Sequence, residues 1–145
     1  MKLFYNPVSS YSQKALMAFY EKNVAFTPAV VNLMDPAARA EYEKTYPIGK
    51  VPALVDDDGK QYPETSVIIE LLDLGYPANP PRLIPEDPAA ALETRRWDRF
   101  CDYYLNDPMQ KIFFDGMRPA DKRDLLGVEQ ARGLRSEEHT SELQS

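Results

Sequence analysis

Short apolar runs alternate with amphipathic stretches along the first half of the chain. Runs rich in β-branched and aromatic residues and closed by turn residues are typical of strands, and apolar side chains three and four residues apart are typical of helices. We therefore expect strands at residues 2–5, 25–31, 53–55 and 60–62. We expect helices at residues 9–22, 36–45 and 63–74, with Gly75 just beyond the last one. This β-α-β-α-β-β-α order over residues 1–76 predicts an α/β fold, a mixed sheet with helices packed on it.

Proline and small polar residues refine these boundaries. Pro28 lacks an N–H, which indicates an edge strand or a bulge. Asp35 and Pro36 form an N-cap followed by a proline at the first helical position. Serines open the first predicted helix, where they are good N-caps.

The second half of the chain has a helical pattern. Five prolines between Tyr76 and Pro88 indicate an interdomain linker over residues 77–88. A long helix is expected over residues 89–106, with an aromatic stripe made by Trp97, Phe100, Cys101 and Tyr104. We expect a further helix from Pro119 that Leu134 cuts short, so residues 89–134 read as the start of an all-helical domain.

Residues 135–145 have no apolar period and no capping pattern. Their back-translation matches a common short-read sequencing adapter, so we expect the segment to be foreign and unpacked, and we exclude it from the fold prediction. The only histidine, His139, lies in it, which removes histidine chemistry from the native part. We expect the natural protein to continue beyond Leu134.

Composition narrows the function classes. The net charge is −6 and no basic run stands out, which argues against a nucleic-acid partner. No apolar run approaches the roughly 18 residues of a membrane span, and we expect no signal peptide. The single cysteine, Cys101, fits a reducing compartment, so we expect a cytoplasmic protein. No metal-ligand motif is present, and we interpret residues 56–59 as a hairpin turn.

The loop at residues 46–52 has unusual backbone chemistry. Gly49 tolerates a positive φ, and Pro52 fits the start of a strand because it cannot donate to a sheet. Val51 is driven towards extended geometry, so its N–H and C=O can point out of the sheet and pair with a bound peptide. The Val51–Pro52 bond is a candidate cis peptide, which these residues alone do not establish.

Residues 46–54, read as Tyr-Pro-Ile-Gly-Lys-Val-Pro-Ala-Leu, are closely followed by Glu64-Thr65-Ser66-Val67-Ile68. This combination resembles the thioredoxin-like N-terminal domain of glutathione S-transferases, where Asn-Pro-x-Gly-x-Val-Pro-x-Leu precedes Glu-Ser-x-x-Ile. The chain departs from that pattern at Tyr46, where Asn is usual, and at Thr65, where Ser is usual. The resemblance covers residues 1–76 well and residues 77–134 in pattern only. It implies that Val51, before a cis Pro52, pairs with the cysteinyl backbone of glutathione.

Residues 9–12, Ser-Ser-Tyr-Ser, lie where the thioredoxin fold carries a Cys-x-x-Cys pair, so dithiol exchange is not available to this chain. The motif is similar to that of serine-type, bacterial members of the family, in which the first serine donates a hydrogen bond to the glutathione sulfur. The resemblance assigns this role to Ser9. Ser10 is an alternative if the loop register slips, and Tyr5 is the rival because other branches of the family use a tyrosine there. Ser9 is also readable as a plain helix cap.

The resemblance also implies contacts to the rest of glutathione. Glu64 and Thr65 are expected to hold the γ-glutamyl end at a helix N-terminus, where backbone N–H groups favour an anion. Lys50 is expected to meet the glycine carboxylate. Glu64 and Thr65 are also readable as a plain helix cap, and Lys50 is also readable as a lone surface lysine. Trp97, Phe100 and Tyr103 or Tyr104 are candidates for the pocket of a second substrate, although core packing is the simpler reading for Trp97.

From this resemblance we expect a glutathione transferase that joins the glutathione thiolate to a small hydrophobic electrophile, with no metal. The alternative is a non-catalytic module that reuses the fold for binding or interaction. The full-length protein is expected to be a homodimer with no membrane or nucleic-acid partner. We expect the 145-residue chain itself to be weakly active or inactive, because part of its helical domain is missing.

Overall fold

The computed structural model describes residues 1–133, which form two compact units. The first unit is Met1–Glu86 and the second begins at Asp87. The boundary falls inside the proline-rich segment that the sequence indicates as a linker. The expectation of an unpacked, foreign segment at 135–145 lies outside the described residues. Within residues 1–133, no helix is long and apolar enough to cross a lipid bilayer.

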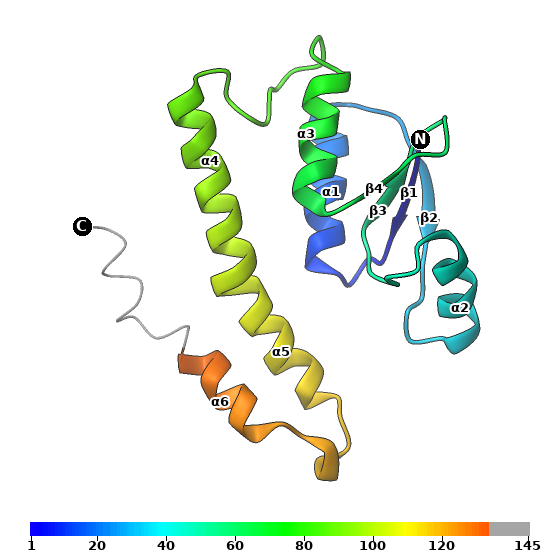
Figure 1. Cartoon of the computed structure of the whole chain (residues 1–145), viewed down its shortest axis with the longest axis vertical. Coiled ribbons are helices and arrows are strands. Elements are labelled where there is room, and N and C mark those ends of the chain that lie inside the picture. Colours follow the sequence, from blue (N-terminus) through cyan, green and yellow to red (C-terminus); the bar gives the residue numbers. More distant parts are fainter. Residues whose placement is uncertain (134–145) are drawn as a thin grey trace. The chain divides into compact units, whose positions relative to one another are not determined.

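A four-stranded mixed sheet is the centre of the first unit (Figure 1). Its strands are β1 (Lys2–Tyr5), β2 (Thr27–Val30), β3 (Ala53–Val55) and β4 (Gln61–Pro63). They lie in the order β2-β1-β3-β4, with β1 parallel to β2 and antiparallel to β3, and with β3 antiparallel to β4. Pro28 lies in β2, an edge strand, as its missing N–H predicts. The element order matches the sequence prediction.

Three helices cover the two faces of the sheet (Figure 1). On one face, α1 (Ser10–Glu21) and α3 (Thr65–Gly75) pack side by side, and α2 (Pro36–Thr45) covers the other. The alternation of side chains along a strand explains both cores. Leu3 and Leu54 are paired and fully buried under α1 and α3, whereas Phe4 and Ala53 pack towards α2.

Capping residues explain where the helices begin. The Ser9 hydroxyl accepts a hydrogen bond from the Ser12 N–H at 3.2 Å and caps α1. The Asp35 carboxylate caps α2, with Pro36 at the first helical position. The end of α3 differs from the prediction. Gly75 is the last residue of the helix, not the left-handed residue after it, and Tyr76 is the C-cap.

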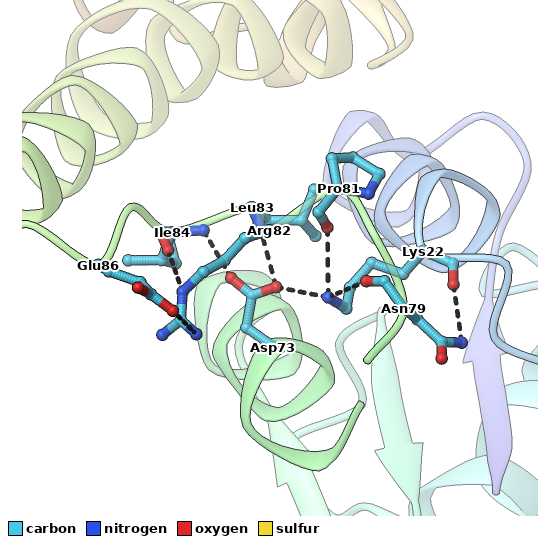
Figure 2. A network of polar contacts seen from close by, with 8 residues as sticks. All are labelled: Lys22, Asp73, Asn79, Pro81, Arg82, Leu83, Ile84 and Glu86. Carbon is cyan, nitrogen blue, oxygen red and sulfur yellow. Dashed lines mark hydrogen bonds and ion pairs between the residues drawn. The ribbon is translucent and has the colours of Figure 1, made fainter. Parts of the chain in front are cut away.

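The segment that follows α3 is held against α1 and α3 by a buried polar network (Figure 2). Lys22, at the end of α1, donates to the carbonyls of Asn79 at 2.9 Å and Pro81 at 3.3 Å. Asp73, in α3, accepts from the Leu83 N–H at 3.0 Å and from the Ile84 N–H. Residues 79–84 are therefore hydrogen-bonded to α1 and α3 through these two side chains.

In the second unit, one continuous helical path changes its winding twice. It runs through α4 (Pro88–Phe100), a π-helical stretch η1 (Cys101–Asn106) and α5 (Asp107–Gly116). The missing N–H of Pro108 falls next to the point where the π-helical stretch ends, which lets the path continue past the proline. The long helix predicted for residues 89–106 thus extends to Gly116.

A 3₁₀ turn, η2 (Ala120–Lys122), leads to α6 (Leu125–Gly133), which packs on α5. The helix predicted from Pro119 therefore begins later. The cause is Asp124, whose carboxylate accepts a hydrogen bond from the Gly127 N–H at 2.9 Å and caps α6.

The aromatic stripe of the second unit is present but is not buried within the described residues. Phe100 contacts Trp97 at a ring-centroid distance of 5.5 Å and Tyr104 at 5.4 Å. Trp97 remains 43% exposed and Tyr104 52% exposed. Trp97 is therefore not enclosed within residues 1–133, and the core-packing interpretation of this residue stays a prediction.

Candidate functional site

Sheet topology brings the predicted site segments to one edge of the first unit. Ala53, at the start of β3, pairs with Phe4 near the end of β1 and with Pro63 at the end of β4. The loop after β1, the residues before β3 and the residues after β4 therefore meet at this edge. Helices α1 and α3 both begin there (Figure 1). We call this region the helix-start edge.

Ser9 lies at the helix-start edge as the N-cap of α1 and is half-buried. Its hydroxyl oxygen accepts from the Ser12 N–H, and its own O–H donates to no acceptor within residues 1–133. The capping role is therefore real, and it leaves one proton available for a bound group. Ser12 is fully buried, and its hydroxyl accepts from the Asn6 N–H at 3.2 Å. Ser12 thus fixes the loop that carries Ser9.

The two alternatives to Ser9 also lie at the helix-start edge. Ser10 is the first residue of α1 and is exposed, and Tyr5 is the last residue of β1 and is half-buried. Which of these three hydroxyls lies nearest to a bound thiol depends on the position of the ligand, so the assignment of Ser9 stays a prediction.

The loop before β3 offers backbone to this edge. The Val51–Pro52 bond is cis, which confirms the expectation raised by the sequence, and Pro52 is buried. Val51 is half-buried, and its N–H donates to no acceptor within residues 1–133. Backbone donors in folded proteins are nearly always paired, so an unpaired N–H beside a strand is suited to an incoming peptide. Lys50 is exposed.

Glu64 precedes α3 with a backbone conformation that few residues adopt. Its φ is +72° and its ψ is 120°, and its side chain is exposed and forms no cap. Strained residues of this kind cost about 1–3 kcal/mol and cluster at functional sites. The Glu64 side chain does not cap α3, and the N-terminus of that helix is the positive end of its dipole, which favours an anion.

Thr65 is buried, with 4% of its surface exposed. Its hydroxyl donates to the Tyr11 carbonyl at 3.3 Å and so connects the beginnings of α1 and α3. The hydroxyl proton is therefore engaged within the protein, although the oxygen can still accept. The expected contact of Thr65 with a carboxylate stays a prediction.

Two tyrosines near the site, Tyr42 and Tyr46, were not among the site residues expected from the sequence. Tyr42 is the buried residue of α2, and its hydroxyl donates to the Lys50 carbonyl at 2.7 Å. Burial, and next the negative charge of Glu64, raise the pKa of Tyr46 above its ordinary value of 10.0. The available signal was a pair of aromatic residues four apart, one inside an otherwise polar helix and one at its C-cap, which favours a buried contact.

The candidates for the second-substrate pocket belong to the second unit. Trp97, Phe100 and Tyr104 form the stripe described above, and Tyr103 is 55% exposed. Tyr103 also lines an open cavity of about 240 Å³ between α5 and α6, together with Asp107 and Lys111. Their part in a substrate pocket stays a prediction. Within residues 1–133, no group of three or more histidine, cysteine or acidic side chains could hold a metal ion.

Comparison with known proteins gives a consistent result. Residues 3–80 match the family model of the glutathione S-transferase N-terminal domain, more than half of the chain. The chain is 34% identical over 109 residues to Protein LigF from Sphingobium sp., covering 72% of this chain and 41% of LigF. The chain spans less than half the length of the curated relatives it matches.

Solved structures agree with the sequence matches. A glutathione S-transferase from Methylobacillus flagellatus with glutathione bound is 30% identical, with a TM-score of 0.82. That match covers 92% of this chain and 63% of the other. A glutathione transferase family member from Pseudomonas fluorescens with bound glutathione is 26% identical, with a TM-score of 0.78, and the match covers 92% of this chain and 65% of the other. The first unit thus has the thioredoxin-like fold of these proteins, followed by a helical region.

Proposed function

The chain belongs to the glutathione S-transferase family, and we propose that it binds glutathione at the helix-start edge. We propose further that the whole protein joins the glutathione thiolate to a small hydrophobic electrophile. The observation that carries the proposal is the N–H of the half-buried Val51, which is unpaired within residues 1–133 and lies in the loop just before β3. The solved structures that resemble this chain include proteins crystallised with glutathione.

The charges at this edge complement those of glutathione, a tripeptide with one amine and two carboxylates. The N-terminus of α3 suits the γ-glutamyl carboxylate, and the Glu64 carboxylate suits the γ-glutamyl amine. Lys50, one residue before Val51, suits the glycine carboxylate. The cysteinyl backbone then pairs with Val51, as in strand addition.

The proposed chemistry requires a thiolate, because the thiol itself is a weak nucleophile. A free thiol has a pKa near 8.5, and a helix N-terminus together with a hydrogen-bond donor lowers it. Ser9 supplies the donor, since its O–H has no acceptor within residues 1–133. The thiol proton passes to solvent, and a sulfur lone pair forms the new S–C bond. The bond to the leaving group breaks, so an aryl halide releases halide; in an epoxide the C–O bond opens and the oxygen takes up a proton from solvent.

The binding-module alternative also has a supporting observation. The Thr65 hydroxyl already donates to the Tyr11 carbonyl, so one donor expected for glutathione is engaged inside the protein. A module that uses the fold without turnover would tolerate this arrangement. A disulfide oxidoreductase is disfavoured, because serines occupy positions 9 and 12 and Ser12 is fully buried.

We propose that the full-length protein is cytoplasmic and homodimeric. The single cysteine, Cys101, supports a reducing compartment, and family membership supports the dimer.

Calorimetry with glutathione tests the proposal, with S-methylglutathione as a control for the free thiol. We expect the chain to bind glutathione, and we expect a version extended by its natural continuation to conjugate aryl halides or epoxides. The absence of binding by both versions would overturn the proposal. Binding by both, without conjugation of any electrophile, would select the binding-module alternative.

A further inference from the structure

One side chain of α2 reaches the loop that offers Val51. The Tyr42 hydroxyl donates to the Lys50 carbonyl at 2.7 Å, a typical O–H···O distance. The Tyr42 ring is 4% exposed and packs against Phe4 at 5.3 Å and Tyr46 at 6.3 Å between ring centroids. A buried ring held on two sides gives its hydroxyl a fixed place. The bond therefore connects the rigid core to one peptide group of the loop.

That peptide group is the one that contains the Val51 N–H. The Lys50–Val51 bond is not among the cis bonds of the described chain, so its carbonyl and its N–H point in opposite directions. Because the Lys50 carbonyl points to Tyr42 in α2, the Val51 N–H must point away from that hydroxyl. Tyr42 thus sets the direction of the Val51 N–H through its hydrogen bond to the Lys50 carbonyl, and not by bonding to Val51 itself.

Other bonds in the loop do not do this. The Gly49 N–H donates to the Tyr46 carbonyl at 2.9 Å and closes a turn, with Gly49 at a φ of +66°. This bond shapes the turn at the C-cap of α2 but does not involve the Lys50–Val51 peptide group. Gly49 allows this conformation because it has no side chain, and an added Cβ would lie 2.7 Å from the Glu43 carboxylate.

The Tyr42 hydroxyl remains a donor at any pH at which the protein works. Burial, and next the neighbouring Tyr46, raise its pKa further above the ordinary value of 10.0. Its donation to Lys50 is therefore not switched off by titration.

We propose that Tyr42 is a positioning residue for glutathione, because it orients the Val51 N–H towards the cysteinyl carbonyl of the tripeptide. This inference rests on the proposed function of the same site. Tyr42 acts on the backbone contact and not on the sulfur. It therefore affects the affinity for glutathione and leaves the pKa of the bound thiol unchanged.

The test compares the full chain with its Tyr42→Phe variant, which keeps the ring and removes the hydroxyl. A neutral hydrogen bond contributes about 0.5–1.5 kcal/mol, so we expect the Kd for glutathione to rise roughly 2- to 13-fold. The pKa of the bound thiol, read from thiolate absorbance, should stay within about 0.2 units of wild type. Ser9→Ala should give the opposite pattern, with a raised thiol pKa and a smaller change in Kd.

Two control variants separate positioning from general damage. Tyr20→Phe removes a phenol hydroxyl that is exposed on α1, and it should leave the Kd unchanged. Phe19→Leu weakens the core under α1 and α3 without touching the loop, so it should lower stability without the same rise in Kd. If Phe19→Leu raises the Kd as much as Tyr42→Phe does, the effect is general destabilisation and the inference is wrong.

A second readout needs no ligand. Amide hydrogen exchange at Gly49, whose N–H is bonded to the Tyr46 carbonyl, should accelerate at least 3-fold in Tyr42→Phe and not in either control. Unchanged exchange together with unchanged Kd would overturn the inference while leaving the proposed function intact. Failure of both the wild-type chain and its extended version to bind glutathione would overturn the proposed function and the ligand role of Tyr42, whatever the exchange rates.

Discussion

The Lys22 ammonium lies 2.8 Å from the Asp73 carboxylate, and the two side chains are only 1% and 3% exposed. This ion pair joins the end of α1 to α3, and both partners also bind the backbone of residues 79–84 (Figure 2). A buried charge is tolerated when it is paired and hydrogen-bonded, as each of these is. The pair therefore fixes the segment that leads out of the first unit.

We predict that Lys22→Met strongly destabilises the first unit. The variant leaves the Asp73 carboxylate buried without its cation, which typically costs about 3–5 kcal/mol. Urea unfolding followed by circular dichroism measures the change in the free energy of unfolding. As a control, Lys44→Met removes the cation of the exposed pair with Glu41 and should leave that free energy nearly unchanged. Equal effects of the two substitutions would contradict the structural role of the buried pair.

The same pair predicts a dependence of stability on pH. Burial alone would raise the pKa of Asp73, but the hydrogen bonds from Lys22, Leu83 and Ile84 and the Lys22 charge outweigh it and lower the pKa below 3.8. Above pH 3.8 the carboxylate is charged in both the folded and the unfolded chain, so its full contribution is present. As the pH falls through the lowered folded pKa, that contribution is lost.

Asp73→Asn provides the reference, because its side chain does not titrate. The free energy of unfolding of wild type minus that of the variant should be constant from pH 7 to about pH 5 and should fall below about pH 4. Urea titrations at each pH measure this difference. A difference that stays constant down to the lowest pH at which both proteins fold would contradict the lowered pKa.

Ser9→Ala is predicted to lower turnover of the extended protein far more than its affinity for glutathione. The substitution removes the donor to the thiolate, so the thiol pKa should rise. It also removes the cap of α1, which contributes about 0.5–2 kcal/mol to stability. Ser9→Thr keeps the hydroxyl and should recover both properties in large part. A silent Ser9→Ala, combined with a strong loss in Tyr5→Phe or Ser10→Ala, would move the role to that other residue.

Glu64→Gly is predicted to change stability and affinity in opposite directions. Glycine adopts a positive φ without steric cost, so relief of the strain at φ +72° should stabilise the unliganded chain by up to about 1 kcal/mol. Loss of the carboxylate should weaken glutathione binding by about 1.5–3 kcal/mol, the usual value for a hydrogen bond to a charged group. Thermal unfolding and calorimetry measure the two effects.

Glu64→Gln is the matched control for this experiment, because it keeps the size and the strained backbone but removes the charge. It should weaken binding without the gain in stability. Unchanged affinity in both Glu64 variants would indicate that this residue only precedes a helix, and would favour the binding-module alternative.

Local signals account for what the sequence predicted correctly. Ser9 and Asp35 mark the starts of α1 and α2 because each carries an oxygen that caps the helix next to it. Pro28 indicates an edge strand because it lacks an N–H. The exceptions follow the same logic. Gly75 resembles a helix terminator in sequence, but α3 includes it. The last helix is capped by Asp124 and not by a residue near Pro119.

The sequence by itself determined the order of the elements and the segments that carry candidate chemistry, because caps, prolines and spacing act between near neighbours in the chain. Only the tertiary structure decided the contacts of Tyr42 with Lys50, Lys22 with Asp73 and Thr65 with Tyr11. These bonds depend on how helices pack on the sheet and on the register of its strands, which no local periodicity encodes. The same packing decides that the Val51 N–H stays unpaired within residues 1–133.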